Sequence, residues 1–397
     1  MILSSKSNSH SRKAINGMVA LWQVAAWMLT AALAAAMVAG AYGGCLDPRR
    51  HSALWSLCTL AFPLVLAAVL VAVAAWALLR RWGRVAVLAV AVVVSWPMVR
   101  VTAPVNLASR GDADSTRSFR LLTFNVMNHG TYDGTQKERN PSMDYILSQD
   151  ADLVLLQEAA VVDSNFLDLP SIKMMKPELL RRYPYRSRGY HDQVLLSKYP
   201  FKAVDNATIG RGVIEPDEQA TLYRFYAKVY DVQMPHGQQL RLVNVHLQSI
   251  GLTSDDKDLY MRLTRLDEGM GSRREMRAVK HSLIDKLSFA FRRRAAAAWN
   301  LRRVLDASPG NVILAGDFND TPGSYAYRTI RGGDMADAWA DCALGPTYTF
   351  HANRLYFHID QVLYRGSLKA VSIKRDRAGD SDHYPLVAEF EWAPPGR

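Results

Sequence analysis

Three apolar stretches fill the first hundred residues, and they constrain the fold more than any other feature of the chain. They run about 18–42, 53–79 and 82–101, and the third reaches that length only with Trp82 and Val101 as interfacial ends. A helix needs about 20 apolar residues to cross a bilayer. A cleaved signal peptide is the alternative for the first stretch, but its apolar part exceeds the usual ~7–15 residues and two further stretches follow. The sequence therefore predicts three transmembrane helices within residues 1–104 of an integral protein of the plasma or inner membrane.

Basic residues around these stretches predict the orientation in the membrane. The N-terminal tail and the loop between the second and third stretches carry three each: Lys6, Arg12, Lys13, Arg80, Arg81 and Arg84. The positive-inside rule assigns both groups to the cytoplasmic side. With three spans, the rest of the chain is then extracytoplasmic; with two spans, the orientation would reverse.

The formal charge of +11 is concentrated in this membrane region. Residues 1–100 hold nine Lys or Arg and one Asp, so residues 101–397 carry only +3. An excess that flanks apolar segments indicates membrane topology rather than DNA binding. Only Cys342 lies beyond residue 100, so no disulfide can form within 101–397, and the three cysteines lack a zinc-like spacing.

A polar linker, 105–118, separates the membrane region from a second part with alternating strand and helix patterns. The patterns predict strands at 119–125, 152–157, 193–197, 222–232, 240–247, 311–317, 358–364, 368–374 and 384–391. They predict helices at 141–149, 174–182, much of 257–306, and 322–331.

Polar residues stand where the apolar runs of this second part end. In chain order they are Asn125, Glu158, His246, Asp317, Asn319, Asp360, Asp382 and His383. Side chains at strand ends converge on one edge of a sheet, where such folds bind their ligands. Amides, carboxylates and histidines that meet there make a site for a hard cation and a phosphate.

Each of these residues also has a plainer interpretation when it is taken alone. Glu158 could be a solvated strand-end carboxylate rather than a cation ligand, and Asn125 could cap a turn. Asp317 and Asn319 could form an ordinary Asx-turn, although Gly316 and Pro322 around them suggest a strand-to-helix corner that faces a phosphate. His246 could be a satisfied core histidine.

The strongest pair is Asp382-His383, because Asp360 accompanies it. A histidine that acts as a general base needs a partner that fixes its tautomer. Asp360, after the run that begins at Leu355, is the natural partner. Asp382 would face the other way and could bind the metal.

As a set, these motifs resemble the endonuclease/exonuclease/phosphatase superfamily over about residues 119–392. The stretch Val194–Pro200 resembles an internal strand of that family. The resemblance implies an α+β fold, a four-layer sandwich of two mixed β-sheets flanked by helices, here preceded by the helical transmembrane region. It also implies dependence on Mg²⁺ or Mn²⁺ in a catalytic domain spanning 119–397.

The same resemblance implies a role for each residue. Glu158 would be the principal metal ligand, with Asn125 and Asp382 near the metal. Asp317 would orient or deprotonate the attacking water, while Asn319 and His246 would hold the phosphate. His383, paired with Asp360, would act as the base or stabilise the transition state. The chain departs from the family at His358, at Gln361 and at 191–193, which puts the transfer of a substrate in doubt.

A basic insert, about 250–309, interrupts the pattern of the second part. Residues 255–305 hold 13 basic and 7 acidic residues, and the segment is predicted to be helical. It is either a solvated helical arm or a patch that contacts anionic headgroups or guides an anionic substrate. The remainder of the domain is then net acidic, which argues against a DNA footprint across a whole face.

The sequence therefore predicts a membrane-anchored, Mg²⁺-dependent phosphoesterase that acts on a lipid headgroup or a small phosphate ester. A DNA or RNA endonuclease of the same superfamily is the first alternative, although a nucleic-acid partner is not favoured. A non-catalytic membrane module that retains the fold is the second.

Overall fold

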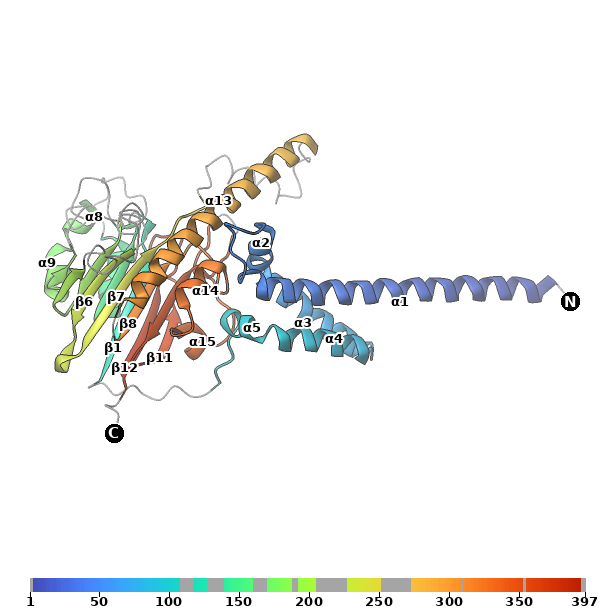
Figure 1. The fold of residues 1–397 in the computed structure, drawn as a ribbon, viewed down its shortest axis with the longest axis horizontal. Coiled ribbons are helices and arrows are strands. Elements are labelled where there is room, and N and C mark those ends of the chain that lie inside the picture. The colour runs from blue at the N-terminus through green and yellow to red at the C-terminus, as the bar shows by residue number, and fades with distance from the viewer. Residues whose placement is uncertain are drawn as a thin grey trace.

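The structure is a computed structural model, shown in Figure 1. It describes residues 3–107, 117–127, 139–159, 170–187, 192–204, 227–250, 273–308, 310–352 and 355–393. Most of the predicted linker, the start of the predicted strand 222–232 and residues 251–272 of the basic insert lie outside the described residues.

Five helices form the N-terminal part: α1 Leu3–Gly43, α2 Leu54–Leu60, α3 Phe62–Leu78, α4 Trp82–Val94 and α5 Trp96–Thr102. One apolar segment, Asn16–Gly43 within α1, is long enough by itself to cross a membrane. The pairs α2–α3 and α4–α5 are bent by 58° and 73°, and there are up to three spans if each bent pair counts as one. Pro63 and Pro97 stand in the first turns of α3 and α5, where a proline ends the hydrogen-bond ladder of the preceding helix. The number and orientation of spans stay predictions.

The rest of the chain contains two six-stranded mixed sheets, as expected. The first has the order β11-β12-β1-β2-β4-β3 and the second the order β5-β6-β7-β8-β10-β9. The strands of the first sheet are β1 Ser118–Asn125, β2 Leu153–Gln157, β3 Tyr185–Arg186, β4 Val194–Ser197, β11 Leu368–Arg375 and β12 Leu386–Trp392. Those of the second are β5 Phe201–Val204, β6 Ala227–Gln233, β7 Gln239–His246, β8 Val312–Asp317, β9 Ala336–Asp337 and β10 Asp360–Arg365. The pairs β1–β2 and β7–β8 are parallel, and the other pairs are antiparallel.

Alternation along the strands explains the four layers. In β1, Leu121 packs into a core between the two sheets, while Leu122 packs outward against α7 (Pro141–Gln149). Ile172 of the short helix α8 (Pro170–Lys173) and Leu179 of α9 (Lys176–Arg182) belong to the same outer core. On the opposite face, α13 (Arg273–Asp306) and α14 (Tyr325–Arg331) cover the second sheet.

The short elements were not predicted from sequence, namely β3, β5, β9, α8 and α15 (Ala338–Cys342). They contain two to five residues each, too few to show a period. The helix expected at 322–331 begins later, at Tyr325, because the Ser324 side chain caps it by accepting a hydrogen bond from the Tyr327 amide.

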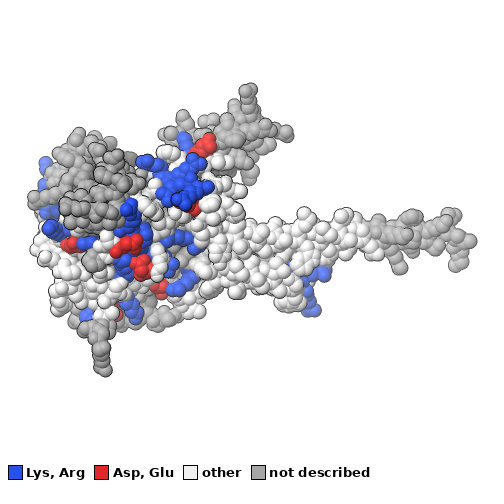
Figure 2. All heavy atoms as spheres, in the orientation of Figure 1, with Lys and Arg blue, Asp and Glu red and all other residues white. Residues whose placement is uncertain are grey.

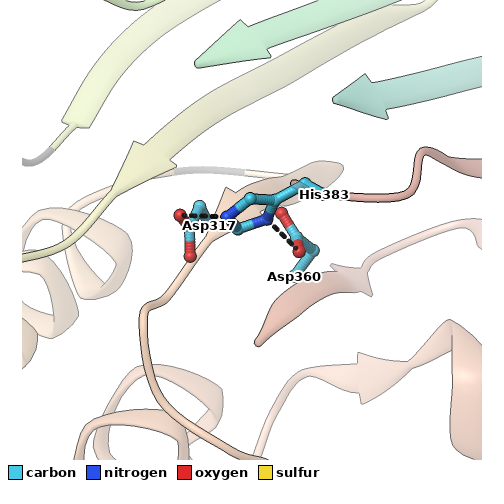
Figure 3. A group of neighbouring side chains, drawn as sticks. All are labelled: Asp317, Asp360 and His383. Atoms are coloured by element: carbon cyan, nitrogen blue, oxygen red, sulfur yellow. Dashed lines mark hydrogen bonds and ion pairs between the residues drawn. The ribbon is translucent and has the colours of Figure 1, made fainter. Parts of the chain in front are cut away.

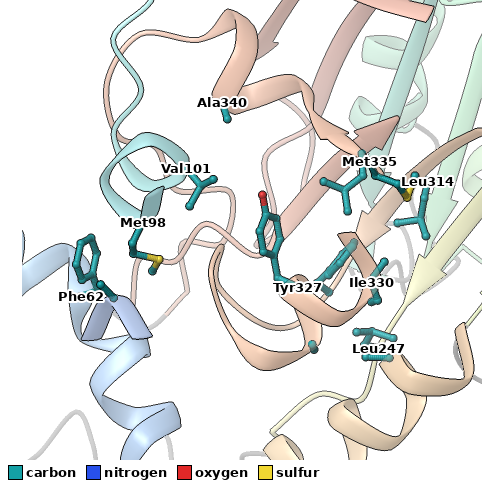
Figure 4. Packing of buried hydrophobic residues seen from close by; sticks show 14 of the residues in the cluster. Phe62, Met98, Val101, Leu247, Leu314, Tyr327, Ile330, Met335 and Ala340 are labelled. Carbon is teal, nitrogen blue, oxygen red and sulfur yellow. The ribbon is translucent and has the colours of Figure 1, made fainter. Parts of the chain in front are cut away.

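One hydrophobic core joins the N-terminal helices to the second sheet's outer layer (Figure 4). Phe62, Met98 and Val101 belong to the same cluster as Tyr327 and Ile330 of α14. Polar contacts reinforce it, since the Arg328 guanidinium donates to the Ala41 carbonyl at 2.7 Å. The two parts of the chain therefore form one packed unit.

Candidate functional site

Strand register brings most of the predicted site residues to one edge of the two sheets. In the parallel pair β1–β2, Asn125 lies opposite Gln157, and in the parallel pair β7–β8, His246 lies opposite Asp317. Asp360 at the start of β10 also lies opposite Asp317. The carboxyl ends of both parallel pairs thus meet, as the motif series predicts.

A buried amide network holds the two sheets in this alignment. The Gln157 amide nitrogen donates to the Asn244 side-chain oxygen at 2.7 Å, and the Asn244 nitrogen donates to the Leu156 carbonyl at 2.9 Å. Gln157 and Asn244 are both fully buried. These bonds favour one alignment of the sheets, because a shift would leave the two buried amide nitrogens without these acceptors.

Asp317 is the centre of the site. Its carboxylate accepts hydrogen bonds from the Asn125 side chain at 3.1 Å, and from both the backbone and the side chain of Asn319, at 2.7 and 3.1 Å. Burial raises the pKa of this 1% exposed carboxyl, and Asp360 raises it further, while His383 and His246 oppose the rise. The side chain is aimed inward at the point where the two sheets meet.

His383 forms the expected pair with Asp360 (Figure 3). The ring Nδ1 lies 2.9 Å from an Asp360 oxygen, and Nε2 lies 3.7 Å from an Asp317 oxygen. The Thr349 hydroxyl holds Asp360 in turn by accepting its backbone N–H at 3.0 Å. Burial alone would lower the His383 pKa, but the negative charges of Asp360 and Asp317 outweigh it and raise the pKa to about 10.

His246 has a carboxylate partner that the motif series missed. Its Nδ1 lies 2.5 Å from an Asp192 oxygen, while Nε2 lies 3.8 Å from Glu158 and 3.9 Å from Asp317. Burial acts to lower the His246 pKa, yet these three carboxylates raise it to about 9. In the sequence, Asp192 stands out only as part of the departure from the family pattern at 191–193. Its carboxylate was the one sign there of a partner for a histidine.

Glu158 and Asp382 add carboxylates to the site: Glu158 lies 3.8 Å from His246 Nε2, and Asp382 precedes His383 in the chain. Glu158 is a third exposed and has a left-handed backbone, with φ of 51°. Burial raises the pKa of Asp382, and the charges of Glu158 and Asp317 raise it further, against the effect of His383. Carboxylates that repel one another in a half-buried position fit a divalent cation, which would offset their charge.

The Asn125 amide directs its nitrogen toward the carboxylates of the site, whereas a direct metal ligand would direct its oxygen there. Its side-chain nitrogen donates to Glu158 and to Asp317, both at 3.1 Å, while its oxygen accepts the Met127 N–H at 3.0 Å. In this arrangement Asn125 orients the two carboxylates. Ligation through its oxygen requires the amide to turn over.

A second group of oxygen and nitrogen atoms could also hold an ion. One ligand atom each from Asp317, Asp360 and His383 lies within 4.8 Å of the others. These three side chains are at most 5% exposed, and the His383 ring already bonds Asp360. A catalytic cation needs positions open to water and phosphate, so the more exposed Glu158 fits that need better.

A protein-family model described as the endonuclease/exonuclease/phosphatase family matches residues 122–383. A second model, described as a domain of unknown function, matches residues 23–102. The search of curated proteins found no match. Residues 103–121 lie between the two matched ranges.

Several solved structures are similar over most of the second part of the chain. An endonuclease/exonuclease/phosphatase from Beutenbergia cavernae is 19% identical, with 70% of this chain and 72% of that one covered and a TM-score of 0.43. The human Nocturnin catalytic domain is 15% identical, with 71% and 96% covered and a TM-score of 0.41. Sphingomyelinase C from Streptomyces griseocarneus is 17% identical, with 68% and 99% covered and a TM-score of 0.37. At these identities and TM-scores, the similarity supports no transfer of substrate.

Proposed function

The chain belongs to the endonuclease/exonuclease/phosphatase family, and on that premise we propose that it is a membrane-anchored, divalent-metal-dependent phosphoesterase. Members of the family are hydrolases of phosphate esters. The observation that carries the proposal is one continuous set of contacts. Asn125 bonds both Glu158 and Asp317, and Asp317 lies 3.7 Å from His383.

This set contains the groups that phosphate-ester hydrolysis needs. Mg²⁺ or Mn²⁺, held by Glu158 with Asp382 nearby, would offset charge on the phosphoryl oxygens. Asn319 and His246 flank Asp317 and would hold the phosphate. Asp317 orients the attacking water and accepts its proton. Against the effect of burial, the charges of Asp360 and Asp317 raise the pKa of His383 and favour its protonated form, which would stabilise charge in the transition state.

The N-terminal helices support membrane anchoring. Figure 2 shows them as an arm that is white over most of its length, with basic side chains at one turn. Arg80 and Arg81 are exposed at the turn between α3 and α4. Many large apolar side chains are exposed along these helices, among them Leu21, Leu64 and Val71, and such a surface suits lipid. The basic turn suits the cytoplasmic side. In our proposal the catalytic domain is extracytoplasmic and acts on a lipid headgroup or a small phosphate ester.

The test is a panel of phosphate esters given to the full chain in detergent or nanodiscs, with Mg²⁺ and with EDTA. The panel contains bis(p-nitrophenyl) phosphate, p-nitrophenyl phosphate, phospholipid and sphingolipid phosphodiesters, and plasmid DNA. We expect metal-dependent hydrolysis of a headgroup or small ester, and its loss in Glu158→Gln. The matched control is Glu178→Gln, on α9, where the carboxylate contacts Arg139 instead.

Three other results would count against the proposal. Plasmid nicking far above the cleavage of the other esters would favour the nuclease alternative. Equal turnover with Mg²⁺ and with EDTA would show that hydrolysis does not depend on a metal. No hydrolysis of any ester would favour a non-catalytic module.

A further inference from the structure

Arg294 in α13 is a buried cation outside the catalytic set. The side chain is 1% exposed, and it is the largest fully buried side chain among the residues that the structure describes. Its neighbours Arg292 and Arg293 are both exposed. One arginine of this basic run is therefore turned into the protein while the other two face solvent, where Figure 2 shows basic side chains gathered over α13.

Arg294 bonds the two segments that leave the catalytic strands. Its Nε donates to an Asp320 carboxylate oxygen at 3.1 Å, and its Nη1 donates to the Gln248 carbonyl at 3.1 Å. Gln248 follows His246 by two residues, and Asp320 is the residue after Asn319. A guanidinium offers several donors in a fixed plane, so one side chain can set the separation of two such segments.

The same two segments also meet directly beside the site. The Leu247 N–H donates to the Asp317 carbonyl at 2.9 Å, and the Asn319 side chain donates to the Leu247 carbonyl at 3.0 Å. Asn319 has a left-handed backbone, with φ of 50°, a conformation that surrounding contacts must maintain. Arg294 supplies such a contact from outside the loop, through the residue next to Asn319.

Stability alone is a weak reason for this ion pair. Asp320 is 5% exposed, and burial raises its pKa, while the charge of Arg294 opposes that rise. An apolar pair of similar volume would often be at least as stable as a buried ion pair. A fixed geometry is what a guanidinium provides and an apolar pair does not.

We propose that Arg294 is a positioning residue for the phosphoesterase site, which keeps the segments that carry His246 and Asn319 at one separation. The inference rests on the proposed function. Displacement of catalytic groups by about 1 Å costs on the order of 10²-fold in rate. Loss of the clamp should therefore lower kcat by about 10²-fold and change KM much less.

The experiment compares variants of the full chain by kcat, KM and thermal unfolding. Arg294→Met combined with Asp320→Asn removes both charges, so no unpaired charge stays buried. Arg294→Lys keeps the charge, but the lysine ammonium lacks the planar set of donors with which the guanidinium bonds both segments. Arg293→Met, at the exposed neighbouring position, is the matched control.

We expect the double variant to unfold near the wild-type temperature, with kcat lowered by about 10²-fold. The kcat of Arg294→Lys should lie between those of the wild type and the double variant. Arg293→Met should match the wild type in both measurements. A double variant with wild-type kcat and wild-type unfolding would overturn the inference, as would a loss of activity no larger than the loss of folded protein. If the double variant does not fold, wild-type kcat in Arg294→Lys overturns it instead. Absence of hydrolysis by the wild type would contradict the proposed function itself, so the two failures are distinguishable.

Discussion

Replacement of Gly316 by alanine should disable the site through the backbone alone. Gly316 has φ of 141°, and an added Cβ would lie 2.1 Å from the Val245 carbonyl oxygen. Real Cβ contacts are essentially never shorter than 3.0 Å, so β7 and β8 would have to separate by about 1 Å. The strained φ adds about 1–3 kcal/mol.

The separation falls beside the catalytic groups. Val245 pairs with Gly316, and the next pair in the register is His246 with Asp317. A shift of about 1 Å there should lower kcat/KM by on the order of 10²-fold. Together with the strained φ, it should also lower the free energy of unfolding by about 2–6 kcal/mol.

The assay is hydrolysis of the best ester from the panel, together with thermal unfolding of the full chain. Gly333→Ala is the matched control, because nothing lies within 4 Å of its added Cβ and its φ is not in the left-handed region. Wild-type kcat/KM and unfolding temperature in Gly316→Ala would refute the argument that the β7–β8 spacing sets the site.

Three further predictions follow from single side chains. Asp360→Asn should lower kcat by roughly 10²–10⁴-fold, because His383 loses the carboxylate that orients its ring and favours its charged form, whereas Asp334→Asn at a partly exposed arginine pair should have little effect; equal loss in both variants would contradict this role. Glu158→Gln should weaken Mn²⁺ binding in calorimetry at least about tenfold, and unchanged affinity would exclude Glu158 as a ligand. Burial lowers the pKa of His358 to about 3. Below pH 6.5 the unfolded chain therefore binds a proton at this histidine that the folded chain does not. The free energy of unfolding should then fall by up to ~1.4 kcal/mol for each pH unit of added acid. In chemical unfolding of the detergent-solubilised chain, His358→Phe should lose less stability than wild type between pH 6.5 and 5, and identical pH slopes would rule this out.

Much of the site could be predicted because its residues are placed by strand ends. A buried apolar run shows where a strand stops, and the parallel pairs then align Asn125 with Gln157 and His246 with Asp317. The short strands and helices were missed because they contain too few residues for a period. Nothing local distinguishes a two-residue strand such as β9 from a turn.

Two residues were missed for different reasons. Asp192 is in a loop, and only the three-dimensional fold brings its carboxylate to His246. Arg294 is one of the 13 basic residues counted in the insert, and nothing in that count shows that it is buried. The helical period of α13 held the signal, because Phe291, Arg294, Ala298 and Leu301 lie on one face, and the other three are apolar and buried.

The packing of the N-terminal helices on the catalytic part also escaped prediction. Apolar residues of a predicted span are expected to face lipid, so the sequence does not show that Met98 and Val101 contact α14 and its neighbours. That contact depends on the bends before α3 and α5.

The location of the bound metal tests the central claim most directly. Anomalous diffraction from Mn²⁺ in crystals of the full chain would locate the ion among the side chains. We predict a peak about 2.1 Å from a Glu158 carboxylate oxygen, with Asp382 on the same ion or one water away. A peak enclosed by Asp317, Asp360 and His383, or no peak at this edge of the sheets, would contradict the account.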